Sequence, residues 1–274
     1  MLPKEGRGRY GGTKEPAPCV LVPLCPWSGI RGGGGLVTGE VSVVLAACNG
    51  SLYLREQVES ILPQLHEGDQ LILSVDPSTD GTCDLACGLA AADSRIVVLQ
   101  GPGQGVPRNF EQAIAASEGA YVFLSDQDDV WCPHKVAAVR DAFAASGAAL
   151  VLHDAQVVDQ DLEVVAPSFF AQRGSRPGYW RNILKNSYIG CCMAFRRELT
   201  QVALPFPERI PMHDQWLGLV GEKNGGVFFL DEPLIAYRRH TANATATTHA
   251  GLAQMLAWRI RLVRELRRRS FSAS

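Results

Sequence analysis

Between residues 41 and 125 the sequence alternates short, almost wholly apolar runs with segments whose apolar residues recur at helical spacing. Such runs predict buried strands, because a strand that is covered on both faces carries no polar side. We expect strands at 41–47, 71–75, 96–99 and 121–125. The intervening segments are long enough for crossover helices, and such crossovers join parallel strands. The chain is therefore predicted to be an α/β protein with a mostly parallel sheet flanked by helices.

Two of the helices between these strands have recognisable ends. Asp80 is expected to cap the helix after the second strand, because its carboxylate can accept from free N–H groups of the first turn. Asn109 is expected to be the N-cap of the next helix, with Gln112 at position N3 and Gly119 closing the helix.

After residue 148 the alternation becomes irregular. Apolar runs predict strands at 148–153 and 189–195 and one or two strands over 227–237, and a short helix is expected at 213–220. We expect antiparallel additions to the sheet in this half of the chain.

The two ends of the chain differ from the middle. Residues 1–39 are rich in glycine, proline and basic residues, without the apolar stretch of a signal peptide, and are predicted to be disordered. Residues 249–274 predict a basic amphipathic helix, in which six arginines are opposed by Glu265 alone. The main domain should span 40–248.

Composition narrows the partners and the compartment. The formal net charge of -2 gives no reason to expect nucleic acid as a partner. The eight cysteines form no CxxC pair, so we infer a reducing, cytoplasmic environment. Zinc binding through Cys191 and Cys192 is not expected, because adjacent residues of a strand point to opposite faces.

An acidic cluster, Asp126-Gln127-Asp128-Asp129, follows the strand at 121–125. Open α/β sheets bind ligands at the carboxyl ends of their strands. Acids this close together repel one another, so they must be solvated or neutralised by a divalent cation. A metal site and an acidic turn that caps the helix opened by Pro133 both remain open from these residues alone.

Further acids lie at predicted strand or loop ends, and three of these loops should meet at one edge of the sheet. They are Asp76, Asp80, Asp154 and Asp214. The chain lacks the GxGxxG and GxxxxGK[ST] nucleotide fingerprints and the GxSxG elbow of acyl-transfer enzymes. A metal at this edge would bind a diphosphate and stabilise charge on a leaving phosphate.

Several motifs in order resemble glycosyltransferase family 2. They are 41–50 (VSVVLAACNG), 76–82 (DPSTDGT), 108–110 (RNF), 125–131 (SDQDDVW), 213–216 (HDQW), and 237–240 (YRRH) followed by Asn243. The DQDDVW form is most similar to the bacterial rhamnosyltransferase branch. The resemblance covers roughly residues 40–245 and implies a GT-A fold, a Rossmann-like sheet, and transfer with inversion. It divides the domain into a nucleotide-binding half, 40–130, and an acceptor half, 131–248.

The resemblance also assigns roles to individual residues. Asp76 matches the acid that binds the base, and Asp126 and Asp128 match the acids of the DxD motif. Asp214 matches the general base. Mg²⁺ or Mn²⁺ would be held by Asp128, with His240 as a further ligand. The residues expected beside the nucleotide sugar are Ala46, Asn49, Asp76, Asn109 and Asp126. One departure from the family pattern is Val75, where a second acid is usual, and another is Pro77 in place of a glycine.

Four of these side chains also have simpler interpretations. Asp80 fits a helix cap better than a ligand, and Asp154 fits a turn acid at a strand end. His240 alone would be a solvated or core histidine. Asp214 alone would be an acid at a helix start, where the helix dipole stabilises its charge.

The resemblance implies direct displacement from a nucleoside-diphosphate sugar, with rhamnose favoured, to a hydroxyl of a glycan or lipid-linked acceptor in bacterial surface polysaccharide synthesis. Two alternatives stay open: a metal-dependent phosphoryl or nucleotidyl transferase, and a catalytically silent nucleotide-sugar-binding paralogue. The C-terminal helix either lies on the inner face of the plasma membrane, since it is too polar to span it, or packs its apolar stripe on the domain.

Overall fold

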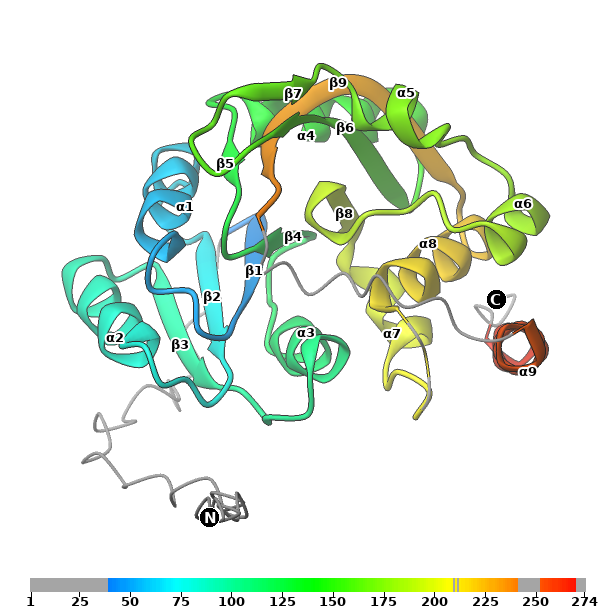
Figure 1. Cartoon of the computed structure of the whole chain (residues 1–274), viewed down its shortest axis with the longest axis horizontal. Coiled ribbons are helices and arrows are strands. Elements are labelled where there is room, and N and C mark those ends of the chain that lie inside the picture. The colour runs from blue at the N-terminus through cyan, green and yellow to red at the C-terminus, as the bar shows by residue number, and fades with distance from the viewer. Residues whose placement is uncertain (1–38, 209, 211, 241–251, 270–274) are drawn as a thin grey trace, which may run out of the picture. The chain divides into compact units, whose positions relative to one another are not determined.

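The structure is a computed structural model that describes residues 39–208, 210, 212–240 and 252–269. The predicted disorder of residues 1–39, apart from the last of them, and the motif position Asn243 lie outside the described residues. A mixed sheet forms the centre, with helices packed around it (Figure 1). Its strands are β1 (Val41–Ala47), β2 (Gln70–Val75), β3 (Ile96–Gln100), β4 (Tyr121–Asp126), β5 (Val130–Trp131), β6 (Leu150–Val158), β7 (Val164–Ala166), β8 (Met193–Arg196) and β9 (Val227–Arg238).

The helices alternate with the strands in the first half of the chain and cluster in the second. They are α1 (Leu54–Ile61), α2 (Thr82–Ala92), α3 (Val106–Ala115), α4 (Lys135–Ser146), α5 (Phe169–Arg173), α6 (Tyr179–Leu184), α7 (Thr200–Ala203), α8 (His213–Lys223) and α9 (Leu252–Arg268). Short 3₁₀ turns lie at Leu62–Gln64, Gly190–Cys192 and Arg197–Leu199.

The first four strands are parallel, as predicted, in the order β3-β2-β1-β4. The chain builds outward from β1 to β3 and then returns to place β4 on the other side of β1. The side chains of β1, β2 and β4 are mostly buried, which accounts for their continuous apolar runs, whereas β3, at the edge of the sheet, is only partly buried. The gap between the carboxyl ends of β1 and β4 is thus a topological switch point, where open α/β sheets bind ligands.

The second half adds strands of both directions. β8 is antiparallel to β4 and β6, and β9 is antiparallel to β5, which confirms the expected antiparallel additions. β9 is one strand that runs parallel to β6, with register shifts where His153 and Asp154 meet it. The predicted strand 189–195 is partly wrong: Gly190–Cys192 is a 3₁₀ turn, and extended pairing begins only at Met193.

Two predicted helix ends have different outcomes. Asp80 Oδ1 accepts from the Thr82 backbone N–H at 3.1 Å, in the first turn of α2, as predicted, although the residue at the N-cap position is Gly81. Asn109, in contrast, is not an N-cap, because α3 begins three residues earlier, at Val106, and ends at Ala115. The Asn109 side chain turns into the sheet and donates to the Ser74 carbonyl oxygen at 3.0 Å. A buried amide that satisfies a strand was misinterpreted as a cap.

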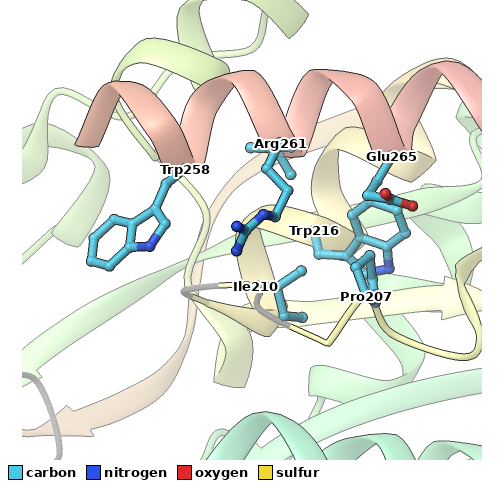
Figure 2. Close-up of a pocket in the computed structure, with 7 residues that line it drawn as sticks. Pro207, Ile210, Trp216, Trp258, Arg261 and Glu265 are labelled. Atoms are coloured by element: carbon cyan, nitrogen blue, oxygen red, sulfur yellow. The ribbon is translucent and has the colours of Figure 1, made fainter. Parts of the chain in front are cut away.

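The C-terminal helix α9 packs on the domain. Leu262 and Leu266 are buried. Lys223 of α8 donates through Nζ to the carbonyl oxygens of Leu266 and Arg269, at 2.7 and 3.0 Å. Figure 2 shows Trp258 and Arg261 projecting from the side of α9 that faces Ile210 and Trp216, with which they line one pocket. Of the two interpretations of this helix, the described side chains support the one in which its apolar stripe packs on the domain.

No helix among the described residues combines the length and apolar character needed to cross a membrane.

Substitution by alanine should change the free energy of unfolding in opposite directions at two glycines. A Cβ at Gly119 would lie 2.7 Å from backbone atoms of Val41 and Ser42, which cannot move without disturbing β1. A Cβ at Gly88, in α2, meets nothing within 4 Å. We expect Gly119→Ala to lower the free energy of unfolding by about 2 kcal/mol or more, and Gly88→Ala to raise it by about 0.5–1 kcal/mol. Urea unfolding measures both changes. An unchanged free energy of unfolding in Gly119→Ala would contradict the close approach of Gly119 to the β1 backbone.

Candidate active site

The site lies at the switch point between β1 and β4. Asp126 ends β4 and is paired in register with Ala46 of β1. The next residue, Gln127, joins the two strand ends: its Oε1 accepts from Cys48 N at 2.8 Å, and its Nε2 donates to Cys48 O at 3.0 Å. Because a Cβ on Gly50 would collide with the Gln127 side chain, the two loops approach as closely as glycine permits. The strand ends therefore form one rigid edge.

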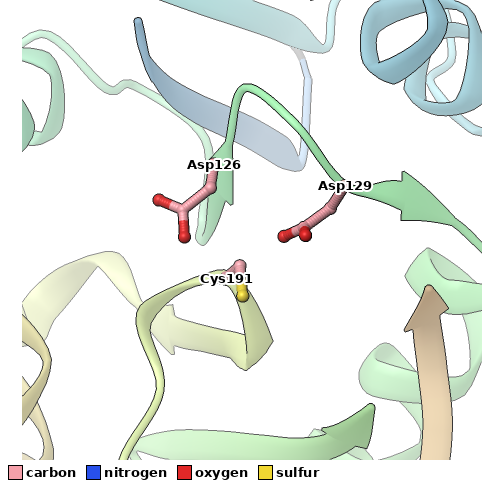
Figure 3. Close-up of side chains that lie close together, drawn as sticks. All are labelled: Asp126, Asp129 and Cys191. Carbon is pink, nitrogen blue, oxygen red and sulfur yellow. The ribbon is translucent and has the colours of Figure 1, made fainter. Parts of the chain in front are cut away.

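Two carboxylates and a thiol converge at this edge. Single ligand atoms of Asp126, Asp129 and Cys191 all lie within 4.8 Å of one another. Figure 3 shows both carboxylates directed toward the space above Cys191, which lies in the turn before β8. Burial, together with the charges of Asp128 and Asp214, raises the pKa of Asp126 to about 7. Burial and the charges of Asp126 and Asp128 raise the pKa of Asp129 as well.

Asp128 occupies the outer side of the same turn. Its Oδ2 lies 2.8 Å from Nε2 of His240, and the His240 ring stacks on Tyr53 with 5.1 Å between ring centroids. The structure thus brings together the two residues expected to hold a metal. They contact each other, whereas Asp129 and Cys191 take the positions beside Asp126.

Arg238, at the end of β9, fixes the shape of this acidic turn. Its backbone N–H donates to Asp129 Oδ1 at 3.0 Å, and its Nε donates to the Asp128 carbonyl oxygen at 2.9 Å. The guanidinium also pairs with Glu56 of α1 and lies over the Tyr53 ring, 4.5 Å from its centroid. These bonds hold three carboxylates at a spacing that their mutual repulsion disfavours.

The residues fit a divalent cation. The Oδ2 atom of Asp129 is buried without a hydrogen-bond partner, although a buried carboxylate oxygen normally has one. Carboxylate oxygens are the ligands that Mg²⁺ and Mn²⁺ prefer, and a cation here would offset the repulsion that raises both pKa values. Asp126 and Asp129 would hold it, with Asp128 adjacent.

The expected nucleotide residues lie along the β1 and β2 ends. Asp76 is buried, and its Oδ1 accepts from the Gly103 backbone N–H at 2.9 Å. Asn109 is buried beside it, with its Oδ1 unpartnered. Asn49 Oδ1 accepts from Thr79 N at 2.9 Å, so Asn49 shapes the loop after β2. The structure gathers these residues on one side of the acidic turn.

Asp214 approaches the acidic turn from the other side, from the first turn of α8. It is 4% exposed, and its Oδ1 accepts from Gln215 N at 2.5 Å and from Asn186 Nδ2 at 3.2 Å. Burial raises the pKa of Asp214 to about 6, although these hydrogen bonds and the charge of Arg173 oppose the shift. The carboxylate is thus ionised at neutral pH yet basic enough to accept a proton.

Two other titratable side chains in this half of the chain are engaged in turn or packing contacts. Asp154 is buried, and its Oδ1 accepts from Ala155 N at 2.7 Å and Phe170 N at 2.8 Å, while Oδ2 accepts from Ser168. Asp154 is therefore the turn acid of the simpler interpretation. Burial lowers the pKa of His213 to about 4, and its ring stacks on Phe110.

Sequence reasoning missed three residues of the site. Asp129 was visible in the acidic motif but received no role. Cys191 approaches from a segment predicted to be a strand. Lys135 is fully buried, donates through Nζ to the Cys191 carbonyl oxygen at 2.9 Å, and has a pKa lowered by burial to about 8. No spacing rule indicates that a lysine of α4 supports the turn that carries Cys191.

The clustered carboxylates at the switch point of the sheet, together with a family comparison, identify the protein as a glycosyltransferase. A model described as Glycosyl transferase family 2 matches residues 42–203, more than half of the chain, so the chain belongs to that family. A putative teichuronic acid biosynthesis glycosyltransferase, TuaG of Bacillus subtilis, is 29% identical over 72% of this chain and 78% of its own length. The Escherichia coli glucosyltransferase WfaP, described as acting with UDP-Glc on α-D-GlcNAc-diphosphoundecaprenol, is 32% identical over 35% of this chain and 38% of its own length.

Solved structures confirm the GT-A architecture. S. aureus TarS 1–349 with UDP-GlcNAc has a TM-score of 0.64 over 82% of this chain and 66% of that chain, at 15% identity. The mannosyltransferase PcManGT of Pyrobaculum calidifontis, with GDP-Man and Mn²⁺, has a TM-score of 0.54 over 83% and 62%, at 17% identity. At these identities the likeness shows the fold.

The unpartnered Asp129 oxygen predicts that a cation binds here. We expect Mn²⁺ to raise the melting temperature of the protein, because a ligand of the native state alone stabilises it by mass action. Asp128→Asn and Asp129→Asn should each weaken the effect, since an amide lacks the charge that holds the ion. Asp84→Asn, an exposed acid of α2, is the control. An undiminished shift in Asp129→Asn would remove this residue from the metal site.

Proposed function

We propose that this glycosyltransferase moves a sugar, with inversion, from a nucleoside-diphosphate donor to a hydroxyl of a glycan or lipid-linked acceptor in bacterial surface polysaccharide synthesis. One observation carries the proposal: a carboxylate suited to act as a base, Asp214, reaches the same edge of the sheet as the acidic turn, and its charge raises the pKa of Asp126. The names of TuaG and WfaP support the polymer and the lipid-linked acceptor. The DQDDVW motif favours rhamnose as the sugar.

On the donor side, Asp76 and Asn109 would contact the nucleoside. Asp76 is held by the Gly103 backbone N–H, and a Cβ on Gly101 would lie 2.3 Å from Asp76 Oδ1 and 2.9 Å from Asn109 Oδ1. The loop after β3 therefore closes against both side chains. Ala46 and Asn49, at the carboxyl end of β1, would lie beside the nucleotide sugar, and Asp126 would lie near the diphosphate.

A divalent cation, Mg²⁺ or Mn²⁺, would neutralise the diphosphate and the charge that develops on it as it leaves. Asp126 and Asp129 would hold this ion. Asp128, paired with His240, would complete the acidic environment on the solvent side. Arg238 keeps these carboxylates in place through its bonds to Asp128 and Asp129.

On the acceptor side, Asp214 would take the proton of the attacking hydroxyl. Both hydrogen bonds described for its carboxylate end on Oδ1, so we assign Oδ2 as the atom that receives the proton. The acceptor oxygen then forms its bond to the anomeric carbon while the bond to the diphosphate oxygen breaks. One displacement inverts the configuration and releases the nucleoside diphosphate.

Replacement of the base tests this assignment. Asp214→Asn should spare donor binding but lower turnover by roughly two to four orders of magnitude, the usual contribution of a positioned general base. Release of nucleoside diphosphate in the presence of acceptor measures turnover, and calorimetry measures donor binding. Asp231→Asn, an exposed acid of β9, is the control. Turnover within a few-fold of the parent would assign the proton to another group, and an intact donor in the parent protein would indicate a silent binding protein.

The raised pKa predicts a pH profile. Asp214 must be ionised to accept a proton, so kcat should fall about tenfold per pH unit below the pKa of about 6 and level off above it. Asp214→Asn should lose this acid limb. Because burial raises the pKa of Asp214 in the folded state, ionisation costs stability as pH rises through about 6, and the variant should be at least as stable as the parent at pH 8. An unchanged acid limb in the variant would contradict the assignment.

A further inference from the structure

Three large apolar side chains are exposed near the acceptor side of the fold. Trp180 and Leu184 of α6 are 67% and 63% exposed, and Ile260 of α9 is 61% exposed. Trp180 and Leu184 are four residues apart, so they lie on one face of α6. Exposed side chains of this size carry an energetic cost in water that a partner surface would relieve.

Contacts between α6 and α9 place these side chains on neighbouring elements. Arg259 of α9 donates through a guanidinium nitrogen to the Leu184 carbonyl oxygen at 2.6 Å. At the other end of α6, burial raises the pKa of Tyr179, and the nearby charge of Arg267 opposes this shift. The helices thus run side by side in opposite directions. Ile260 directly follows Arg259.

The position of α9 is fixed by its inner face. Arg269 donates to the carbonyl oxygens of Val202, Leu204 and Pro205 at 2.9–3.1 Å, and Leu262 and Leu266 are buried. Leu262 and Leu266 of α9 are therefore already used in packing. Insertion into a membrane would have to use another set of side chains, and those of α6 are available.

The charge around the exposed apolar side chains is mostly positive, although Glu222 of α8 accepts from the Gly178 backbone N–H at the start of α6. Between Glu163 and Glu198 the sequence contains no acid. The outward side chains near the apolar group are basic, and they are Arg181, Lys185, Arg264 and Arg267. The one acid of α9, Glu265, pairs with Arg268. A cationic surface with a tryptophan and a leucine at its centre complements anionic lipid headgroups over an acyl layer.

We propose that this α6–α9 surface, formed by Trp180, Leu184, Ile260 and the four basic residues just named, binds an anionic lipid membrane. Trp180 and Leu184 enter the interface, and the basic side chains contact the headgroups. The inference rests on the proposed function, in that a lipid-linked acceptor brings its hydroxyl to the enzyme from the membrane.

The chain links this surface directly to the base. Asn186 follows Leu184 by two residues and donates to Asp214 Oδ1 at 3.2 Å. Arg173 lies close enough to Asp214 to lower its pKa against the effect of burial, and its carbonyl oxygen accepts from Lys185 Nζ at 3.3 Å. The basic surface thus extends from the proposed membrane contact to the acceptor side of the site. The hydroxyl of an acceptor anchored in the membrane would then reach Asp214 close to the lipid surface.

Vesicle flotation tests the proposal on the full chain. We expect the protein to float with phosphatidylcholine vesicles that contain about a third phosphatidylglycerol, and not with phosphatidylcholine alone, because each basic residue near an anionic surface contributes about 1 kcal/mol. The double variant Arg264→Glu, Arg267→Glu should lower partitioning about tenfold or more. The double variant Trp180→Ala, Leu184→Ala should also lower it, and the parent's binding should weaken in high salt.

Two control substitutions of the same kinds lie elsewhere on the surface. Val165→Ala removes an exposed apolar side chain of β7, and Arg55→Glu reverses an exposed charge of α1. Both should float like the parent, and all variants should bind nucleotide-sugar donor with the parent's affinity. Failure of the parent to float, equal flotation of the α6 variants and the parent, or concentration-dependent self-association through this surface would overturn the proposal. Donor binding and sugar transfer are measured separately, so their failure would overturn the proposed function instead.

Discussion

The structure depends on how a sheet edge tolerates several carboxylates at once. Asp126, Asp128 and Asp129 follow one strand, and Asp214 enters from α8. Their repulsion and burial raise the pKa values of Asp126, Asp129 and Asp214. Such an arrangement costs folding energy, and it persists because Arg238, Gln127 and Asn186 hold its parts from three directions.

The two sides of this edge differ in their support, and in the proposed function the first would take the donor and the second the acceptor. Asn109 donates to a carbonyl oxygen of β2 in the parallel half of the sheet, and Asp76, just after β2, accepts from the Gly103 N–H of the loop after β3. Asp214 and Asn186 belong to the segment between β7 and β9, in which helices, turns and loops surround the four-residue strand β8. A rigid donor half suits a nucleotide of fixed shape, and the acceptor half leads outward to the basic surface of α6 and α9.

Much of this could be predicted from the sequence because its signals are local. The apolar runs at 41–47 and 121–125 coincide with β1 and β4, and the acids after β4 follow from strand direction alone. The errors arose where a distant contact decides the local structure. Asn109 is of a residue type common at helix caps, but its side chain donates to the Ser74 carbonyl oxygen. Cys191 lies in a turn whose carbonyl oxygen accepts from Lys135, 56 residues away in the sequence. Nor could the sequence decide whether α9 packs on a membrane or on the domain, because either surface would bury the same apolar stripe.

A structure determined with Mn²⁺ and a nucleoside diphosphate tests the central claim most directly. Anomalous scattering locates the manganese without assumptions about the ligand. The account predicts one ion between the diphosphate and the carboxylates of the acidic turn, with an oxygen of Asp126 or Asp129 at roughly 2.0–2.6 Å from it. A diphosphate bound at this edge with no ion, or with an ion away from these carboxylates, would contradict the account.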